Sequence, residues 1–174
     1  MAEARPAAPA REDVPHPGHP CDAESGDGEL TRVADILDHK GRTIATTAPD
    51  ATVLRAAGEL RVRAIGALIV SSDGKHLDGL IDERDIVYGL ARFGHAIVDM
   101  HVRDVMRRGV PTCTPEDTVH HVMTEITRWR ARHLPVLEHG ILCGIVSIGD
   151  VVKIRLDASE QELTVLRDAY LARH

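Results

Sequence analysis

Apolar residues recur at helical spacing in two segments of this chain. The sets are Val53, Ala56, Ala57 and Leu60 in the first segment, and Val119, Val122, Met123 and Ile126 in the second. Both follow the i, i+3, i+4, i+7 spacing that places side chains on one face of a helix. We therefore expect two amphipathic helices, each with one buried face.

Each of these segments is followed by two short apolar runs, which are typical of paired strands. The runs are 67–71 and 77–81 in the first half of the chain, and 133–137 and 141–146 in the second. Turn signals at Asp73-Gly74 and His139-Gly140 separate the members of each pair, so we expect two hairpins. The expected lead helices begin at Val33 and Val102, and the expected last helices begin near Asp82 and Ser147.

The two halves repeat each other along the sequence. Thr46, Pro49, Thr52, Val53 and Glu59 recur with the same spacing as Thr112, Pro115, Thr118, Val119 and Glu125, and Gly79, Asp85 and Val87 recur as Gly144, Asp150 and Val152. Such repetition means that one supersecondary unit is used twice, and two copies are too few for a solenoid. We expect an α+β fold whose copies are related by a pseudo-two-fold axis.

A third unit, 159–171, has no counterpart in the repeat. It opens with Ser159 and Glu162, which have the spacing of a capping box, and it carries apolar Leu163, Leu166 and Tyr170. We expect a separate C-terminal helix here, within a segment 158–174, that packs across the two copies or against a second subunit.

Composition separates the first 28 residues from the rest. They are rich in proline and acidic residues, and they carry most of the net charge of −6, so a disordered tail is expected at 1–28. His16, His19 and Cys21 leave open a soft-metal site in this tail, although a solvated tail is the simpler interpretation. The remaining chain is almost neutral, which disfavours nucleic acid and anionic membranes as partners.

Three cysteines without a CxxC pair argue against a disulfide framework. The N-terminus lacks an apolar signal region, and no run of residues approaches the length that spans a membrane. We therefore expect a cytoplasmic protein.

The pattern Gly-h-h-x-x-x-Asp, where h is apolar, ends the second strand of each copy. It reads 79–85 in the first copy and 144–150 in the second. Asp82 with Asp85, and Ser147 with Asp150, have N-cap to N3 spacing and would cap a helix. The same geometry would offer an anion free N–H groups, and would offer ribose hydroxyls a carboxylate. The two interpretations are compatible.

With these motifs the chain resembles a pair of CBS (cystathionine β-synthase) domains, the Bateman module, of the small stand-alone bacterial type. The resemblance rests on 65–70, 79–85, 132–136 and 145–150, and it covers roughly 31–156. It implies CBS repeats at 29–95 and 96–157, each with a small, mainly three-stranded sheet and flanking helices. It also implies a homodimer, a regulated protein partner of unknown identity, and adenine nucleotides bound between the repeats: AMP first, NAD or ATP next, with S-adenosylmethionine also known in the family.

The resemblance also implies which residues bind the nucleotide. The first cleft would comprise Thr43, Ile44, Ala45, Ala67, Leu68, Asp82, Arg84 and Asp85, with Arg132 and His133 from the opposite copy near phosphate; the second would comprise Val110, Pro111, Thr112, Leu134, Pro135, Ser147 and Asp150. Asp85 and Asp150 would hold ribose. The first copy departs from the family pattern, because Asp82 replaces the usual hydroxyl and would repel phosphate unless Arg84 offsets it.

The chain shows no nucleophile–base pair, phosphate loop or dinucleotide fingerprint, so we expect no enzyme, no catalytic cofactor and no metal site. A protein-interaction scaffold with vestigial clefts is the alternative, and Asp82 favours it. We expect a non-catalytic regulatory sensor of adenine nucleotides.

Overall fold

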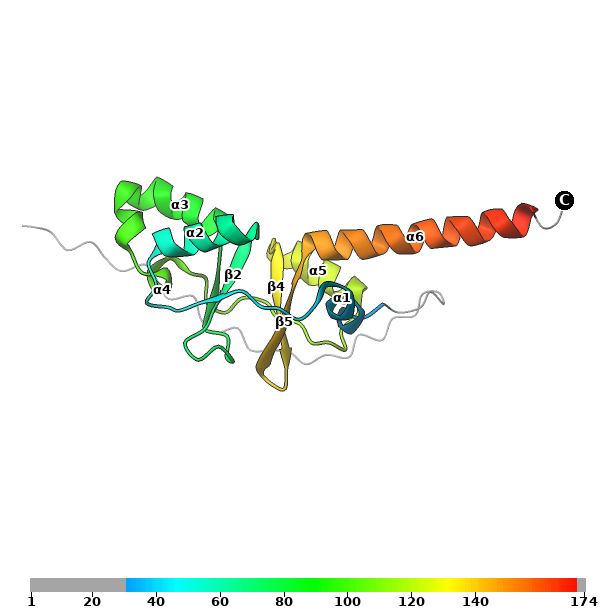
Figure 1. Ribbon diagram of the computed structural model, residues 1–174, viewed down its shortest axis with the longest axis horizontal. Helices are drawn as coiled ribbons and strands as arrows, with labels where there is room; N and C mark the ends of the chain where they lie inside the picture. The colour runs from blue at the N-terminus through cyan, green and yellow to red at the C-terminus, as the bar shows by residue number, and fades with distance from the viewer. Residues whose placement is uncertain (1–30, 172–174) are drawn as a thin grey trace, which may run out of the picture.

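The structure is a computed structural model that describes residues 31–171 of the 174 in the chain. The expected tail at 1–28, with its histidines and Cys21, lies outside the described residues. Two repeats of mixed helix and strand lie side by side (Figure 1), in agreement with the expected fold class. The elements are α1 (Val33–Lys40), β1 (Thr46–Thr47), α2 (Val53–Arg63), β2 (Ala67–Val70), β3 (Gly79–Asp82), α3 (Glu83–Phe93), the 3-10 helix η1 (Gly94–Asp99), α4 (Val102–Val105), α5 (Val119–Trp129), β4 (His133–Glu138), β5 (Ile141–Ser147) and α6 (Ile148–Leu171).

Helices α2 and α5 are the two amphipathic helices that the sequence predicts. Each begins at a threonine N-cap: Arg55 N donates to Thr52 Oγ1 at 3.2 Å, and His121 N donates to Thr118 Oγ1 at 3.1 Å. Their buried residues are Val53, Ala56 and Leu60, and Val119, Val122 and Ile126. The expected burial of Met123 is wrong, since its side chain is 38% exposed: the core lies on the i+3 side of each helix, which leaves the i+4 position at the margin.

The two sheets differ in completeness. In the first, β1 pairs parallel to β2, and β2 pairs antiparallel to β3. In the second, β4 and β5 pair antiparallel, and the place of β1 is taken by a single bridge in which Cys113 N donates to Pro135 O at 3.1 Å and Leu137 N donates to Cys113 O at 2.8 Å. The second hairpin turns at His139 and Gly140, both with positive φ. The first has a longer loop, 71–78, so β3 begins at Gly79 rather than at 77.

The lead helices are exchanged between the repeats. Helix α1 packs on β5 and α6, and α4 packs on α2 and α3 (Figure 1). Their first N–H groups donate to carbonyls of the other repeat: Val33 N to Asp117 O at 2.9 Å, and Val102 N to Ala51 O at 2.8 Å. Each repeat core therefore includes the lead helix that precedes the other copy in the sequence.

A third apolar cluster joins the two sheets. Its buried members are Ala67, Ile69, Leu80 and Leu142. Ile44 and Val110, which are the equivalent positions before the first strand of each copy, pack against it. The repeats are thus held together by their sheets, and the segments that the resemblance assigns to adenine border this contact.

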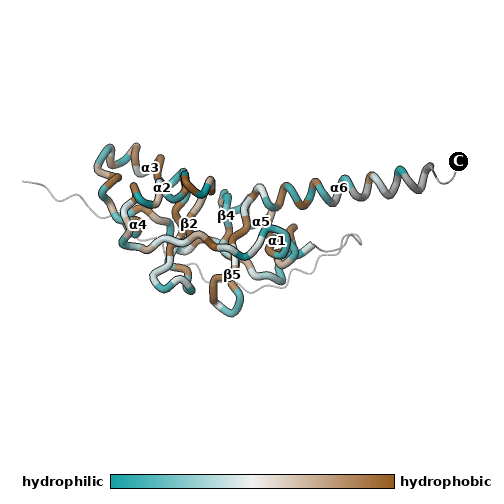
Figure 2. The backbone as a smooth tube through the Cα atoms, viewed as in Figure 1, coloured by the Kyte–Doolittle hydropathy of each residue, from teal (hydrophilic) through white to brown (hydrophobic). Residues whose placement is uncertain are grey.

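Helix α6 is a single helix from Ile148 to Leu171. The expected separate helix opening at Ser159 is therefore wrong: Ser159 is an interior, exposed residue of a helix that is already formed. The C-terminal part of α6 projects away from the two repeats (Figure 1), and the positions that Figure 2 colours there include both hydrophobic and hydrophilic ones. Leu163, in this projecting part, is 64% exposed. Within residues 31–171, no helix combines the length and the apolar character needed to cross a membrane.

Candidate functional site: the two strand-to-helix junctions

The two Gly-h-h-x-x-x-Asp segments form the β3–α3 and β5–α6 junctions. At the first, Asp85 N donates to Asp82 Oδ1 and Asp82 N donates to Asp85 Oδ2, both at 2.9 Å. At the second, Asp150 N donates to Ser147 Oγ at 3.2 Å and Ser147 N donates to Asp150 Oδ2 at 2.7 Å. The capping interpretation is confirmed at both junctions, and each carboxylate is fixed beside a helix N-terminus.

The glycines of this pattern allow the exchanged lead segments to come close. A Cβ atom on Gly79 would lie 2.6 Å from Arg107 O, and one on Gly144 would lie 2.6 Å from Leu37 Cδ2. Leu37 belongs to α1, and Arg107 follows α4. The absence of a side chain at these two glycines therefore allows the lead segments to pack closely.

Arg107 occupies the first junction. Its Nη2 lies 2.6 Å from Asp82 Oδ2 and its Nε lies 2.9 Å from Asp85 Oδ1, so one guanidinium pairs with both carboxylates. The carboxylate side chains are nearly buried, at 6% and 10% exposure. Burial raises the pKa of Asp85, against the opposing effects of the Asp82 N–H and of Arg107.

Lys40, the last residue of α1, occupies the second junction. Its Nζ lies 2.6 Å from Asp150 Oδ2, which also accepts from Ser147 Oγ at 2.8 Å. Burial acts to raise the pKa of Asp150, but the hydrogen bonds from Lys40 and Ser147 outweigh it, and the pKa lies below its usual value.

Sequence reasoning missed both of these cations. It named Arg84 as the group that could offset Asp82, but Arg84 Nη1 instead donates across the repeats to Arg130 O at 3.4 Å. The one sequence signal was that Lys40 ends one lead helix and Arg107 comes two residues after the other, and this signal becomes useful once the exchange of those helices is known.

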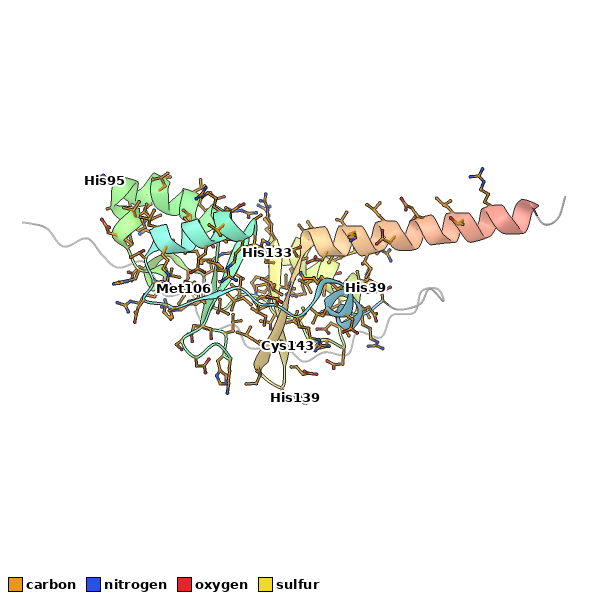
Figure 3. The ribbon with its side chains drawn as sticks, in the orientation of Figure 1. His39, His95, Met106, His133, His139 and Cys143 are labelled. Carbon is orange, nitrogen blue, oxygen red and sulfur yellow. The ribbon has the colours of Figure 1, made fainter. Side chains whose placement is uncertain are left out.

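His133 lies between the two repeats (Figure 3). A Cβ atom on Gly66 would lie 3.1 Å from His133 Cε1. The two residues line a small hollow together with Asp82, Glu83, Arg84 and Arg132. His133 Nδ1 is buried without a hydrogen-bond partner. Burial lowers the pKa of His133, while Asp82 acts to raise it. The structure thus brings Arg132 and His133 next to the first junction.

The backbone segments assigned to adenine lie where each copy enters its sheet. Thr43, Ile44 and Ala45 lead into β1, and Ala45 O accepts from Ile69 N at 3.0 Å. The corresponding residues of the second copy, Val110, Pro111 and Thr112, lead into the Cys113 bridge and are half-buried. The strand residues Ala67, Leu68, Leu134 and Pro135 are all buried.

Burial raises the pKa of both described cysteine thiols, Cys113 and Cys143. Burial raises the pKa of the Cys113 thiol to about 12, so it stays protonated near neutral pH. Within residues 31–171, no group of three or more histidine, cysteine, aspartate or glutamate residues could hold a metal ion.

Known proteins resemble this chain along most of its length. The family model of the CBS domain matches residues 33–92 and 102–157. The CBS domain-containing protein CBSX3, mitochondrial, of Arabidopsis thaliana is 33% identical over 162 residues, which are 87% of this chain and 77% of that protein.

Two solved structures extend this similarity to the fold. A CBS-domain containing protein from Agrobacterium tumefaciens is 40% identical with a TM-score of 0.72, covering 76% of this chain and 99% of that one. The CBS domain pair of protein MJ0100, solved in complex with 5′-methylthioadenosine and S-adenosyl-L-methionine, is 25% identical with a TM-score of 0.64, covering 71% of this chain and 98% of that one. The chain belongs to the CBS-domain family and carries two CBS repeats.

Proposed function

We propose that this chain is a non-catalytic regulatory module that binds an adenine nucleotide, AMP first and NAD or ATP next, between its two CBS repeats. The observation that carries the proposal is the pair Ser147 and Asp150, held by reciprocal hydrogen bonds at the start of a 24-residue helix. The complex of the MJ0100 pair with two adenosine compounds supports this ligand class.

The chemistry of the junctions suits the parts of a nucleotide. A half-buried carboxylate such as Asp150 accepts hydrogen bonds from ribose hydroxyls, and a helix N-terminus favours phosphate. Backbone N–H and C=O groups at 43–45 and 110–112 would offer donors and acceptors to adenine. Arg132 is exposed at the hollow between the repeats, where its guanidinium would meet a phosphate group.

Regulation would follow from where the ligand binds. A nucleotide that contacts both repeats favours the arrangement to which it binds more tightly, and a protein partner would sense that shift. A homodimer fits the exposed apolar residues on α2, α3 and α6, which a second copy would cover. These residues are Leu54 and Val62 of α2, Val87, Tyr88 and Leu90 of α3, and Ile148, Val152 and Leu156 of α6.

A scaffold with vestigial clefts is the second candidate, and Arg107 is the observation that favours it. One guanidinium already pairs with both carboxylates of the first junction. If the second junction were also unable to bind a nucleotide, only the protein surfaces would remain functional.

Thermal melting with AMP, ADP, ATP, NAD and S-adenosylmethionine in parallel separates these candidates. A ligand that binds only the folded state at about 100 times its Kd adds about 2.7 kcal/mol to the free energy of unfolding, which raises Tm by several degrees. GMP serves as the base control. No shift with any adenine compound, in protein shown to be free of co-purified nucleotide, would support the scaffold. Turnover of a bound nucleotide would contradict a non-catalytic role.

A further inference from the structure

We infer that the two clefts are not equivalent: Arg107 closes the first cleft to ribose, and the nucleotide binds in the second cleft, at Asp150. The inference rests on the proposed function and adds to it the cleft that is used and the residue that decides this.

Both carboxylates of the first junction have their oxygens engaged. Asp82 Oδ1 accepts from Asp85 N, and Asp82 Oδ2 accepts from Arg107. Asp85 Oδ2 accepts from Asp82 N at 2.9 Å and from Arg107 Nε at 3.1 Å, and Asp85 Oδ1 lies 2.9 Å from the same Nε atom in the ion pair. A ribose hydroxyl would have to displace a guanidinium from a nearly buried pair of acids, and the displaced charges would then be uncompensated.

The backbone of Arg107 is fixed to the same strand that carries Asp82. Leu80 N donates to Arg107 O at 3.0 Å, and Arg107 N donates to Leu80 O at 2.9 Å. The Arg107 carbonyl also lies against Gly79, where a Cβ would be 2.6 Å away. Because Arg107 is held on both sides of its Cα, its guanidinium is preorganised over the two acids. Asp82, which replaces the usual hydroxyl residue, is therefore paired with a cation of the same chain, Arg107.

The second junction keeps a carboxylate oxygen available. The hydrogen bonds that Asp150 accepts from Lys40, Ser147 N and Ser147 Oγ all reach Oδ2. No described residue donates to Oδ1. Lys40 makes a single contact from the end of α1, from its Nζ to Asp150 Oδ2, whereas the guanidinium of Arg107 pairs with two carboxylates. Moving the lysine ammonium toward solvent or a phosphate breaks one contact, and moving the guanidinium breaks both of its contacts.

The ionisation of the two acids agrees with this difference. The pKa of Asp150 is lowered, so Asp150 stays ionised near neutral pH and accepts strong hydrogen bonds from hydroxyl groups. Burial instead raises the pKa of Asp85, whose charge depends on Arg107 for compensation.

The test measures AMP stoichiometry and affinity by titration calorimetry on the full chain. Wild type is expected to bind one AMP per chain, and Asp150→Asn to weaken this binding at least about tenfold, because a charged acceptor is lost.

The double variant Asp82→Thr/Arg107→Met restores the hydroxyl pattern and is expected to gain a second equivalent of AMP. Adding Asp85→Asn to it should remove that second equivalent. Asp50→Asn, which breaks an exposed ion pair with Arg103 outside the clefts, is the control for charge.

A measurement on wild type guards against misfolded variants. Amide hydrogen exchange with and without AMP should show protection at 145–150 and little change at 80–85. Protection centred on 80–85, or wild-type binding that survives Asp150→Asn, would overturn the inference while leaving the proposed function intact. Absence of binding in every variant would overturn both. Binding that appears only in the double variant would support closure by Arg107 and overturn the use of the second cleft.

Discussion

Lys40 Nζ lies 2.6 Å from Asp150 Oδ2, although the two residues are 110 positions apart in the sequence. The contact exists because α1 packs against β5 and α6, so the end of the first lead helix reaches the junction of the second repeat. Arg107 repeats this relationship in the opposite direction, from the segment after α4 to the junction of the first repeat. Each candidate cleft is therefore completed by a cation from outside its own repeat motif.

Replacing Lys40 should reveal the ionisation of Asp150. Lys40→Met is expected to lower the free energy of unfolding near neutral pH by about 0.5–1 kcal/mol, as for a partly exposed ion pair. The pKa of Asp150 in the folded chain lies below its ordinary value of 3.8. Its stabilising contribution is therefore present above pH 3.8 and is lost as the pH falls through the lower, folded value.

Denaturant unfolding across an acidic pH series checks this expectation. The difference between wild type and Lys40→Met should stay constant above about pH 5 and vanish in stronger acid. Arg42→Met, which removes an exposed pair with Asp38, should cost less at every pH. A wild-type-to-Lys40→Met difference that does not change with pH would contradict the proposed coupling.

Glycine substitutions should rank by what the new Cβ meets. Gly79→Ala would bring a Cβ against the backbone carbonyl of Arg107, and Gly144→Ala against the side chain of Leu37. Both are overpacking changes that typically cost about 1–3 kcal/mol. Gly79→Ala should be the worse, since a side chain can shift more easily than backbone.

Gly58→Ala in α2 is the matched control, because nothing lies within 4 Å of its added Cβ. It should raise the free energy of unfolding by up to about 1 kcal/mol through helix propensity. Thermal unfolding of the three variants provides the ranking. Equal losses of unfolding free energy in Gly79→Ala and Gly144→Ala would contradict this ranking.

His133 should make the ligand-free protein sensitive to mild acid. Burial lowers the pKa of His133 below its ordinary value of 6.5, so the unfolded chain binds the proton more readily than the folded one. Stability should then fall as the pH drops below 6.5 toward the folded pKa. The charged groups that act on His133 are Asp82, Arg107, Lys40 and Asp150.

His133→Gln should lose this part of the pH dependence. The exposed His95 offers the control His95→Gln, which should retain it (Figure 3). Unfolding free energies between pH 5 and pH 8 provide the measurement. A slope in His133→Gln equal to that of wild type would assign the acid sensitivity to other groups.

Ser159→Ala distinguishes a continuous α6 from a helix that starts at Ser159. In the interior of a helix, alanine is favoured over serine by roughly 0.5 kcal/mol, so the helix around Ser159 should become more stable. At an N-cap, the same change would cost about 1 kcal/mol. Ser147→Ala is the control of opposite sign, because Ser147 Oγ accepts from Asp150 N. Amide exchange of 157–163 reports the result, and faster exchange in Ser159→Ala would contradict a continuous helix.

Much of the fold and part of the candidate site follow from local sequence. The buried faces of α2 and α5 show in apolar spacing, and the caps at Asp82–Asp85 and Ser147–Asp150 show in residues three positions apart. These features depend on interactions within about one helical turn, so the side chains that make them are neighbours in the sequence. Because the two halves repeat each other, an element predicted in one half was also predicted at the equivalent position of the other half.

The sequence alone therefore determined two CBS repeats, their helices and hairpins, and the acids at their junctions. Only the tertiary structure decided that the lead helices exchange repeats, that α6 runs unbroken past Ser159, and that Arg107 and Lys40 meet these acids. The physical reason is that a contact between distant segments depends on how whole helix faces pack and which charges that packing buries. The number of residues between Lys40 and Asp150, or between Arg107 and Asp85, does not indicate that these side chains are in contact.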